Sequence, residues 1–257
     1  MVGPIHPDPH GVHRRRYGPR PPARAHTRRP AWRWLWWLPL GFVGVSLLLT
    51  APLRWWAPPA TAFMLAARIE AAYAGRAGFE VRHAWVPLAA QSPWMAVAAI
   101  AAEDQKFPRH HGFDVESVRA ALAAKARGAR LRGASTLSQQ LAKNLYLWSG
   151  RSWLRKGLEA WFTVLLEALL DKRRILELYV NLVEFGPGLY GVEAASRQFF
   201  GHGAASLRPD EAALLAAVLP NPRVYDAAAP GPYLRARQRW LVAQMRQIGG
   251  AGVLHDL

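Results

Sequence analysis

The sequence contains no cysteine and is poor in carboxylates. Without cysteine, disulfides, thiolate nucleophiles and zinc–thiolate sites are excluded. The 17 acidic residues face 33 basic ones, which gives a net charge of +16. Such a basic excess suits a membrane surface, nucleic acid or a phosphorylated substrate, and charge alone does not choose among them. The nine histidines show no metal-ligand spacing. We therefore expect no cofactor, while dependence on a divalent metal stays open.

The basic excess is unevenly distributed along the chain. Residues 1–33 hold eight arginines and one aspartate, together with many proline, glycine and histidine residues. A segment of this composition cannot bury a core, so we predict a disordered basic tail.

An uncharged apolar segment follows the tail at residues 34–53. Twenty apolar residues are enough to cross the hydrocarbon core of a bilayer as a helix. Tryptophans frame the segment, as interfacial aromatic belts do: Trp34, Trp36, Trp37, Trp55 and Trp56. A cleaved signal peptide has a shorter apolar core, and a buried core helix is rarely framed in this way. We predict a single-pass anchor with a cytoplasmic amino terminus and the rest of the chain in a periplasm-like space.

Beyond the anchor the pattern is helical throughout. We predict a connector over 54–84, one all-α domain over 85–248 and a carboxyl-terminal tail over 249–257. Ser92 is the expected cap of the first domain helix, with Pro93 in its first turn. Further helices are expected at 136–148, 153–170, 173–183, 189–199, 208–219 and 233–247. No strand pair is evident.

The stretch 115–132 is rich in alanine and arginine and reads as a helix that frays into a mobile basic loop. Anionic lipid headgroups attract such segments by roughly 1 kcal/mol per charge. We expect its cations, Lys125, Arg127, Arg130 and Arg132, to lie on the membrane.

Two polar blocks do not fit a pattern set by packing. The first block runs from Glu103 to Asp114. Its Glu103 ends an almost uncharged apolar run, so burial is expected to raise the pKa of Glu103 and make it a better base. For an isolated Glu-Asp pair, a solvated helix end is the more common explanation. The second block, Gly133 to Asn144, combines hydroxyl, amide and lysine side chains, which suits a polar substrate with negative charge.

Four cations lie within 14 residues: Lys143, Arg151, Arg155 and Lys156. Fixed cations stabilise a departing phosphate because its charge develops in the transition state, although a solvated basic face is the usual explanation for a charge run. Glu159 lies at i+4 from Arg155, so a helix salt pair and a catalytic role are both open.

The cations at 172–174 lack the aromatic interleaving typical of nucleic-acid binding, so we expect no nucleic-acid partner. Residues 186–191 match G-x-G-x-x-G but follow a helix, which predicts a turn rather than a dinucleotide site.

Taken in order, these blocks resemble the peptidoglycan glycosyltransferases that share a lysozyme-like helical fold, and within them the monofunctional biosynthetic transglycosylases. The motif E-D-x-x-F-x-x-H-x-G is matched by Glu103, Asp104, Phe107, His110 and Gly112. The motif G-x-S-T-x-x-Q-Q followed by K-N is matched by Gly133, Ser135, Thr136, Gln139, Gln140, Lys143 and Asn144. R-K-x-x-E is matched by Arg155, Lys156 and Glu159, and K-x-x-I-L-E-x-Y-x-N by Lys172, Ile175, Leu176, Glu177, Tyr179 and Asn181.

The resemblance implies an inner-membrane enzyme that polymerises lipid II into β-1,4 glycan strands, with inversion and release of undecaprenyl diphosphate. It implies that Glu103 and Glu159 are catalytic. Its implied substrate-binding residues are Asp104, Phe107, His110, Ser135, Thr136, Gln140, Lys143, Arg151, Arg155 and Lys156. The implied partners are lipid II, the growing strand, membrane lipids and other wall-synthesis proteins. A lytic enzyme of the same fold and a non-enzymatic scaffold are the alternatives, and the basic cluster disfavours the first because glycan cleavage releases no diphosphate.

Overall fold

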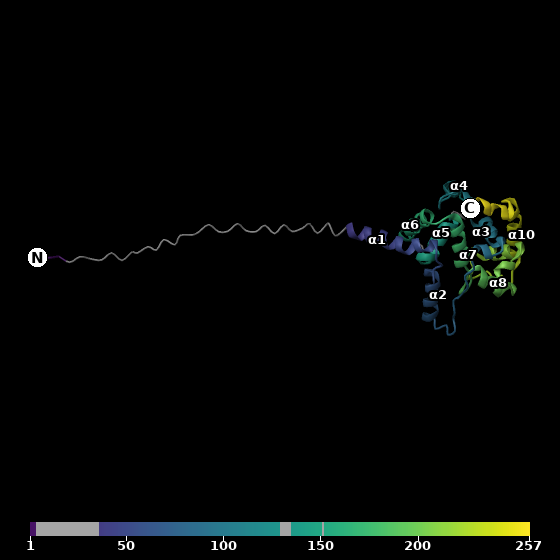
Figure 1. Cartoon of the computed structure of the whole chain (residues 1–257), viewed down its shortest axis with the longest axis horizontal. Helices are drawn as coiled ribbons and strands as arrows, with labels where there is room; N and C mark the ends of the chain where they lie inside the picture. Colours follow the sequence, from purple (N-terminus) through teal and green to yellow (C-terminus); the bar gives the residue numbers. More distant parts are fainter. Residues whose placement is uncertain (4–35, 129–134, 151) are drawn as a thin grey trace. The chain divides into compact units, whose positions relative to one another are not determined.

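A computed structural model describes residues 1–3, 36–128, 135–150 and 152–257 (Figure 1). The chain forms two compact units, Met1–Gly41 and Phe42–Leu257. Almost all of the predicted basic tail lies outside the described residues. Helix α1 spans Trp37–Thr50 and continues into the 3-10 turn η2 (Ala51–Arg54). This 18-residue stretch is apolar and long enough to cross a membrane, and most of its side chains are exposed. It fits a single-pass anchor.

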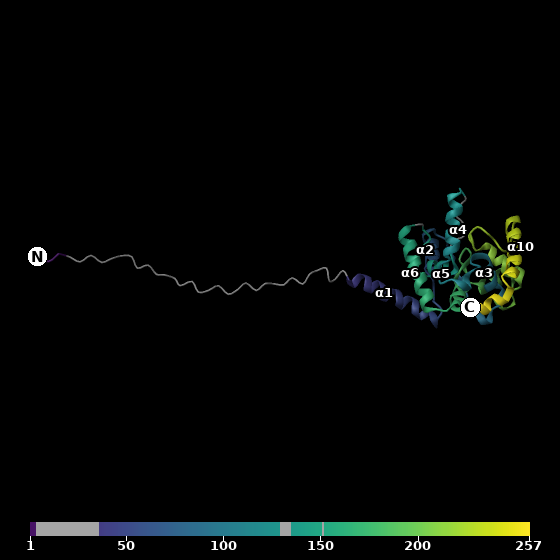
Figure 2. The same cartoon turned by 90° about the horizontal axis from the view of Figure 1, so that it is seen from above.

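The second unit is built mainly from helices, which confirms the all-α fold class (Figures 1 and 2). They are α2 (Ala62–Tyr73), α3 (Pro93–Glu103), α4 (Val115–Ala126), α5 (Leu137–Tyr146), α6 (Trp153–Leu169), α7 (Lys172–Leu182), α8 (Val192–Phe200), α9 (Pro209–Val218) and α10 (Pro232–Gln247). Short 3-10 helices are η3 (Leu88–Ala90), η4 (Phe107–Arg109), η5 (Ala204–Ser206) and η6 (Gly250–Asp256). The segments predicted as connector and tail therefore contain α2 and η6, which pack against α5 and α3 respectively.

The expectation of no strand pair is wrong, because the structure contains a small three-stranded sheet. Strand β3 (Leu189–Tyr190) pairs in parallel with β1 (Arg82–His83) and antiparallel with β2 (Glu184–Gly186). Residues 186–191 thus form the turn and second strand of a hairpin. Helix α8 accordingly begins at Val192 rather than at 189. Strands of two or three residues are too short for an alternating pattern to reveal them.

Helix α3 lies at the centre of the second unit, packed against α7, α9 and α10. Its residues 95–101 are all buried, as are residues 211–218 of α9. Many of these positions are alanine, and small side chains allow two helix axes to approach closely. The axis of α3 is therefore fixed on several sides, and so is the place where α3 ends, at Glu103.

Two local expectations have different outcomes. Pro93 lies in the first turn of α3, as predicted. Ser92, however, makes no side-chain capping bond. Its hydroxyl donates instead to the carbonyl of Leu207, at 2.7 Å, because the residue is buried against the segment before α9. Helix α4 covers the start of the basic stretch, where Lys125 and Arg127 are exposed. Arg130 and Arg132 lie outside the described residues.

Candidate active site

Glu103 is the last residue of α3, and its carboxylate is mostly withdrawn from water. The side chain is 16% exposed. Burial raises the pKa of Glu103 above that of an ordinary glutamate, and a hydrogen bond from Gln140 and the charge of Arg237 oppose the shift only in part. The apolar run before Glu103 predicted this effect. A carboxylate with a raised pKa is a better proton acceptor at neutral pH than a solvated one.

A chain of hydrogen bonds fixes the Glu103 carboxylate. The side-chain amide of Gln140, on α5, donates to Glu103 Oε2 at 2.9 Å. The amide oxygen of Gln140 accepts a hydrogen bond from the hydroxyl of Tyr179, on α7, at 3.0 Å. Tyr179 is fully buried, and its burial raises the pKa of its phenol, so this group stays a donor. Gln140 is thereby locked in the orientation that presents its N–H to Glu103.

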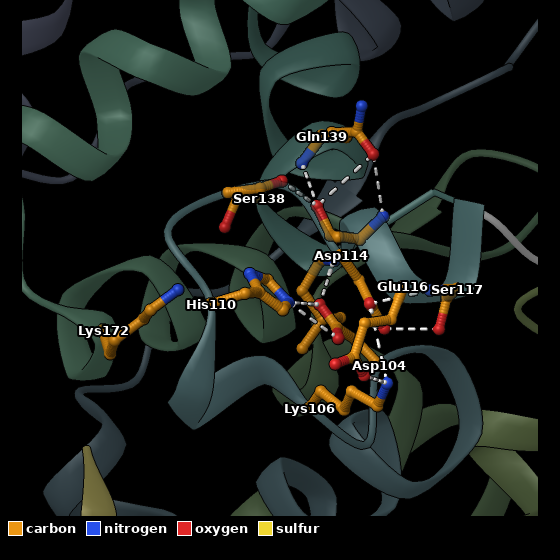
Figure 3. Close-up of polar contacts among 12 residues, drawn as sticks. Asp104, Lys106, His110, Asp114, Glu116, Ser117, Ser138, Gln139 and Lys172 are labelled. Carbon is orange, nitrogen blue, oxygen red and sulfur yellow. Dashed lines mark hydrogen bonds and ion pairs between the residues drawn. The ribbon is translucent and has the colours of Figure 1, made fainter. Parts of the chain in front are cut away.

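Asp104 takes no part in the hydrogen bonds that fix Glu103. Its carboxylate binds the first turn of α5 instead. His110 Nε2 lies 2.9 Å from both carboxylate oxygens of Asp104, as Figure 3 shows. The backbone N–H of Leu137 donates to Asp104 Oδ2 at 3.0 Å. That N–H belongs to the helix start, where no intrahelical acceptor exists. Asp104 therefore joins the end of α3 to the beginning of α5.

Thr136 and Phe107 complete this support. Thr136 forms a capping box with Gln139 at the start of α5, and its hydroxyl donates to the carbonyl of Gly112 at 2.6 Å. Phe107 is fully buried under the ammonium of Lys172, 4.4 Å from its ring centre. In the structure the side chains of Thr136, Phe107 and His110 contact other parts of the protein and support the fold. Contact between them and a substrate stays a prediction.

Replacing Asp104 with alanine should destabilise the protein, because the buried N–H of Leu137 would lose its acceptor. An unsatisfied buried donor costs about 1–3 kcal/mol. For a domain of this size that corresponds to a fall of about 2–12 °C in melting temperature. Thermal unfolding of the purified protein, followed by circular dichroism, measures the change. Asp104→Asn keeps one acceptor oxygen and should recover part of the loss. A wild-type melting temperature for Asp104→Ala would show that Asp104 does not support α5.

Lys143 lies on α5, one turn beyond Gln140, with its ammonium 5.4 Å from the ring centre of Phe63. Burial lowers the pKa of Lys143, and the charge of Glu159 opposes the shift. The charges of Arg155, Lys156 and Glu103 also act on Lys143. The structure therefore brings Lys143, the cations of α6 and Glu103 into one region.

Glu159 is buried and paired with both cations that precede it on α6. Arg155 Nη1 lies 2.8 Å from one carboxylate oxygen, and Lys156 pairs with the other. Glu159 is 3% exposed, so the pairing is not that of a solvated surface. It fixes the two cations near Lys143. Arg151, the fourth predicted cation, lies outside the described residues, as does Gly133.

The two partners of the Glu103–Gln140 hydrogen bond line two different cavities. Glu103 lines a cavity of about 300 Å³, the Glu103 cavity, together with Asp104, Ser135 and Thr136. Gln140 lines a cavity of about 290 Å³, the Lys143 cavity, together with Lys143 and Asn144. The Glu103 cavity also contains the ammonium of Lys106, and the Lys143 cavity also contains Arg223 with its partners Glu70 and Glu184. This arrangement can hold two polar reactants, with a base beside one and a cation beside the other.

Sequence reasoning missed several side chains that belong to these cavities. Arg237, on α10, lies 3.8 Å from Glu103 Oε1, and Trp240 on the same helix lines the Glu103 cavity. In the Lys143 cavity, Arg223 pairs with Glu184 at 3.2 Å and with Glu70 at 2.9 Å. These residues are far from the motifs in sequence, and only the packing of α2, β2 and α10 brings them close.

The fourth motif mainly supports the fold. Asn181 exchanges two hydrogen bonds with the backbone of Val86, each of 3.0 Å, and Glu177 accepts one from the N–H of Leu88. Lys172 pairs with Glu167 at 2.8 Å. Tyr179 is the member of this motif that reaches the site, through Gln140. Among the described residues, no group of three or more histidine, aspartate and glutamate side chains is arranged to hold a metal ion.

Comparison with known proteins shows the family to which the chain is similar. A family model described as Transglycosylase matches residues 70–246. A protein named biosynthetic peptidoglycan transglycosylase from Xanthomonas campestris pv. campestris (strain B100) is 51% identical over 235 residues, which cover 91% of this chain and 94% of the relative. Proteins with the same name from Stutzerimonas stutzeri (strain A1501) and Shewanella amazonensis (strain ATCC BAA-1098 / SB2B) are 52% and 51% identical, over 85% and 91% of this chain and 90% and 94% of their own length.

Proposed function

Because the chain belongs to the transglycosylase family and is a peptidoglycan glycosyltransferase with a lysozyme-like helical domain, we propose that it polymerises lipid II into linear β-1,4 glycan strands and releases undecaprenyl diphosphate. The observation that carries the proposal is the mostly buried carboxylate of Glu103, which lines one cavity and is held by Gln140, together with Lys143, which lines a second cavity with Gln140. A peptidoglycan precursor linked to a diphosphate needs both groups.

The proposed step is an inverting displacement. Glu103 takes the proton from the 4-hydroxyl of the acceptor sugar, and that oxygen attacks the anomeric carbon of the donor. The bond from that carbon to the diphosphate oxygen breaks, and the electron pair leaves with the lipid diphosphate. Inversion converts the α-linked diphosphate into a β-1,4 bond. No general acid is needed, since a diphosphate leaves readily, in contrast to the acid and carboxylate pair of a glycosidase.

The cations serve the departing group in this scheme. Lys143 and Arg151 neutralise the charge that develops on the diphosphate, assisted by Arg155 and Lys156. Glu159, which binds Arg155 and Lys156, positions them. Ser135 lines the Glu103 cavity and is exposed, which supports contact with an oxygen of the substrate bound there. Thr136 and Gln140 act by holding α5 and Glu103.

Incubating the purified protein with lipid II tests the proposal directly. Glycan strands and undecaprenyl diphosphate are the expected products, measured by gel electrophoresis and mass spectrometry. A lytic enzyme would instead shorten preformed strands, and a scaffold would leave both substrates unchanged. The cations Lys143, Arg155 and Lys156 disfavour the lytic alternative, because cleavage of a glycan releases no diphosphate.

We also propose that α1 anchors the protein in the inner membrane with the catalytic domain in the periplasm. The support is the arginine-rich tail before the apolar segment and the length of that segment. A phosphatase reporter at the carboxyl terminus, which is active outside the cytoplasm, should be active. A fluorescent reporter inserted after residue 33 should fluoresce in the cytoplasm. A carboxyl-terminal phosphatase that is inactive would reverse the topology and separate the site from its exported substrate.

A further inference from the structure

One large aromatic side chain of the Glu103 cavity has no role in the proposed chemistry. Trp240 lies on α10, whose buried face consists of Leu234, Leu241 and Met245. Trp240 lies off that face and is 48% exposed. A tryptophan ring is not needed there to complete the core. It nevertheless lines the same cavity as Glu103.

Two contacts fix the position of Trp240 relative to the catalytic carboxylate. Arg237, one turn before Trp240, lies 3.8 Å from Glu103 Oε1. Gln244, one turn after it, accepts a hydrogen bond of 2.9 Å from the side-chain amide of Gln105. Residues three and four apart share one face of a helix. This face of α10 is therefore tied to the end of α3 on both sides of the indole ring.

Apart from the small side chains of Ala101 and Ala102, the rest of the cavity lining is polar. Glu103, Lys106, Ser117 and Ser135 line the same space as Trp240. The volume of about 300 Å³ is at the lower end of the usual ~300–1,000 Å³ of ligand pockets, which suits a small unit of a longer ligand. An apolar aromatic plane with polar groups around it matches a pyranose ring, which has an apolar C–H face and a rim of hydroxyls.

We propose that Trp240 is the stacking surface for the acceptor sugar. This inference rests on the proposed function. In an inverting displacement the acceptor oxygen approaches from the side opposite the leaving group. Since Lys143 lines the other cavity, the diphosphate occupies that one and the acceptor sugar occupies the Glu103 cavity. Trp240 then holds the ring so that its 4-hydroxyl meets Glu103.

Binding of a glycan that cannot act as donor tests this role. The probe is a β-1,4-linked N-acetylglucosamine tetrasaccharide, which carries no diphosphate, titrated into the full chain in detergent by calorimetry or saturation-transfer NMR. Trp240→Ala should weaken binding about tenfold, the scale of truncating an aromatic anchor. Trp240→Leu keeps a large apolar side chain that supports folding, and it should lose as much affinity as Trp240→Ala. Trp240→Phe should recover most of the affinity because it keeps an aromatic face.

Tyr233→Ala is the matched control, since Tyr233 is an exposed aromatic residue of α10 that stacks on Tyr225. The affinity of the Tyr233→Ala protein for the tetrasaccharide should equal that of the wild type. Wild-type affinity in Trp240→Leu, an equal loss in Tyr233→Ala, or no binding by the wild type would each overturn the proposal. No donor is present, so the result does not depend on Glu103 acting as base. Failure of the proposed function would appear separately, as polymerisation that survives Glu103→Gln.

Discussion

Replacing Glu103 with glutamine is expected to slow glycan polymerisation by ~10²–10⁴-fold, the usual contribution of a positioned general base. Glutamine has nearly the same shape and can still accept the hydrogen bond from Gln140, but it cannot take a proton. Initial rates of lipid II consumption at saturating substrate measure the change. Glu80→Gln is a control, because Glu80 is an exposed glutamate of the same unit, Phe42–Leu257, and lines neither cavity. More than a tenth of the wild-type rate in Glu103→Gln would remove Glu103 as the base.

The same substitution should not destabilise the protein at pH 7. Burial raises the pKa of Glu103, so the folded state binds the proton more tightly than the unfolded state does. The resulting stabilisation is present at low pH and is lost as the pH rises through the folded-state pKa. At pH 7 the charged side chain is therefore unfavourable, and the neutral glutamine should keep or raise the melting temperature. A lower melting temperature would mean that the loss of activity reflects misfolding.

The pH dependence of the wild-type reaction should report the same carboxyl group. Because a general base must be deprotonated to act, the proposed role of Glu103 predicts that kcat/KM rises with pH, with a midpoint above the ~4.3 of an ordinary glutamate. In Glu103→Gln this acidic limb should vanish from the residual activity. An unchanged limb would assign it to another group.

The contrast between Glu103 and its neighbour Asp104 shows what the sequence could and could not predict. An apolar run that precedes Glu103 predicted burial, because a helix without polar residues has no face to expose. The raised pKa follows from that burial alone. The contacts of Asp104 with His110 and Leu137 depend on how α3 meets α5, which the spacing of residues does not determine. Motif membership therefore did not distinguish a candidate base from a residue that supports the fold.

Sequence patterns could not predict contacts between residues that are far apart in the sequence, for a similar reason. Arg237 is more than a hundred residues from Glu103 in the sequence. An arginine on the polar face of an amphipathic helix is ordinary, so the sequence pattern offers no reason to assign Arg237 to the active site. Strand β1 has two residues, so it shows no alternation. Ser92 matched a capping signal, but its buried hydroxyl found an acceptor in Leu207. In each case a tertiary contact outweighs a local preference.

Removing the charge of Lys143 is the second change with a large expected effect. Lys143→Met keeps an apolar stem over Phe63 and deletes the ammonium. A fixed cation that acts on developing charge is typically worth ~10²–10³ in turnover. We expect kcat for lipid II to fall by that factor and the affinity for lipid II to fall less, because the diphosphate gains charge as it departs. Arg151→Ala is expected to act in the same direction.

The comparison of turnover with binding separates this role from general electrostatic attraction. Arg239, an exposed arginine of α10, provides the control, because Arg239→Met removes one positive charge away from both cavities. It should leave turnover unchanged. Normal turnover of both Lys143→Met and Arg151→Ala at saturating substrate would reduce the cations to surface charge, and the lytic alternative would gain support.

The pH profile gives a further test of Lys143, because its ammonium titrates in an unusual range. Burial lowers the pKa of Lys143, so the side chain loses its proton at a lower pH than the ~10.4 of an ordinary lysine. Turnover should therefore fall on the alkaline side before an exposed lysine would titrate. We expect the Glu103 carboxylate to set the acidic limb and Lys143 the alkaline one, which gives a bell-shaped profile with the active form between them. Lys143→Met should remove the alkaline limb and leave the acidic one in place, because the two groups act on different reactants. Loss of both limbs together would mean that Lys143 acts by tuning Glu103 rather than by holding the diphosphate.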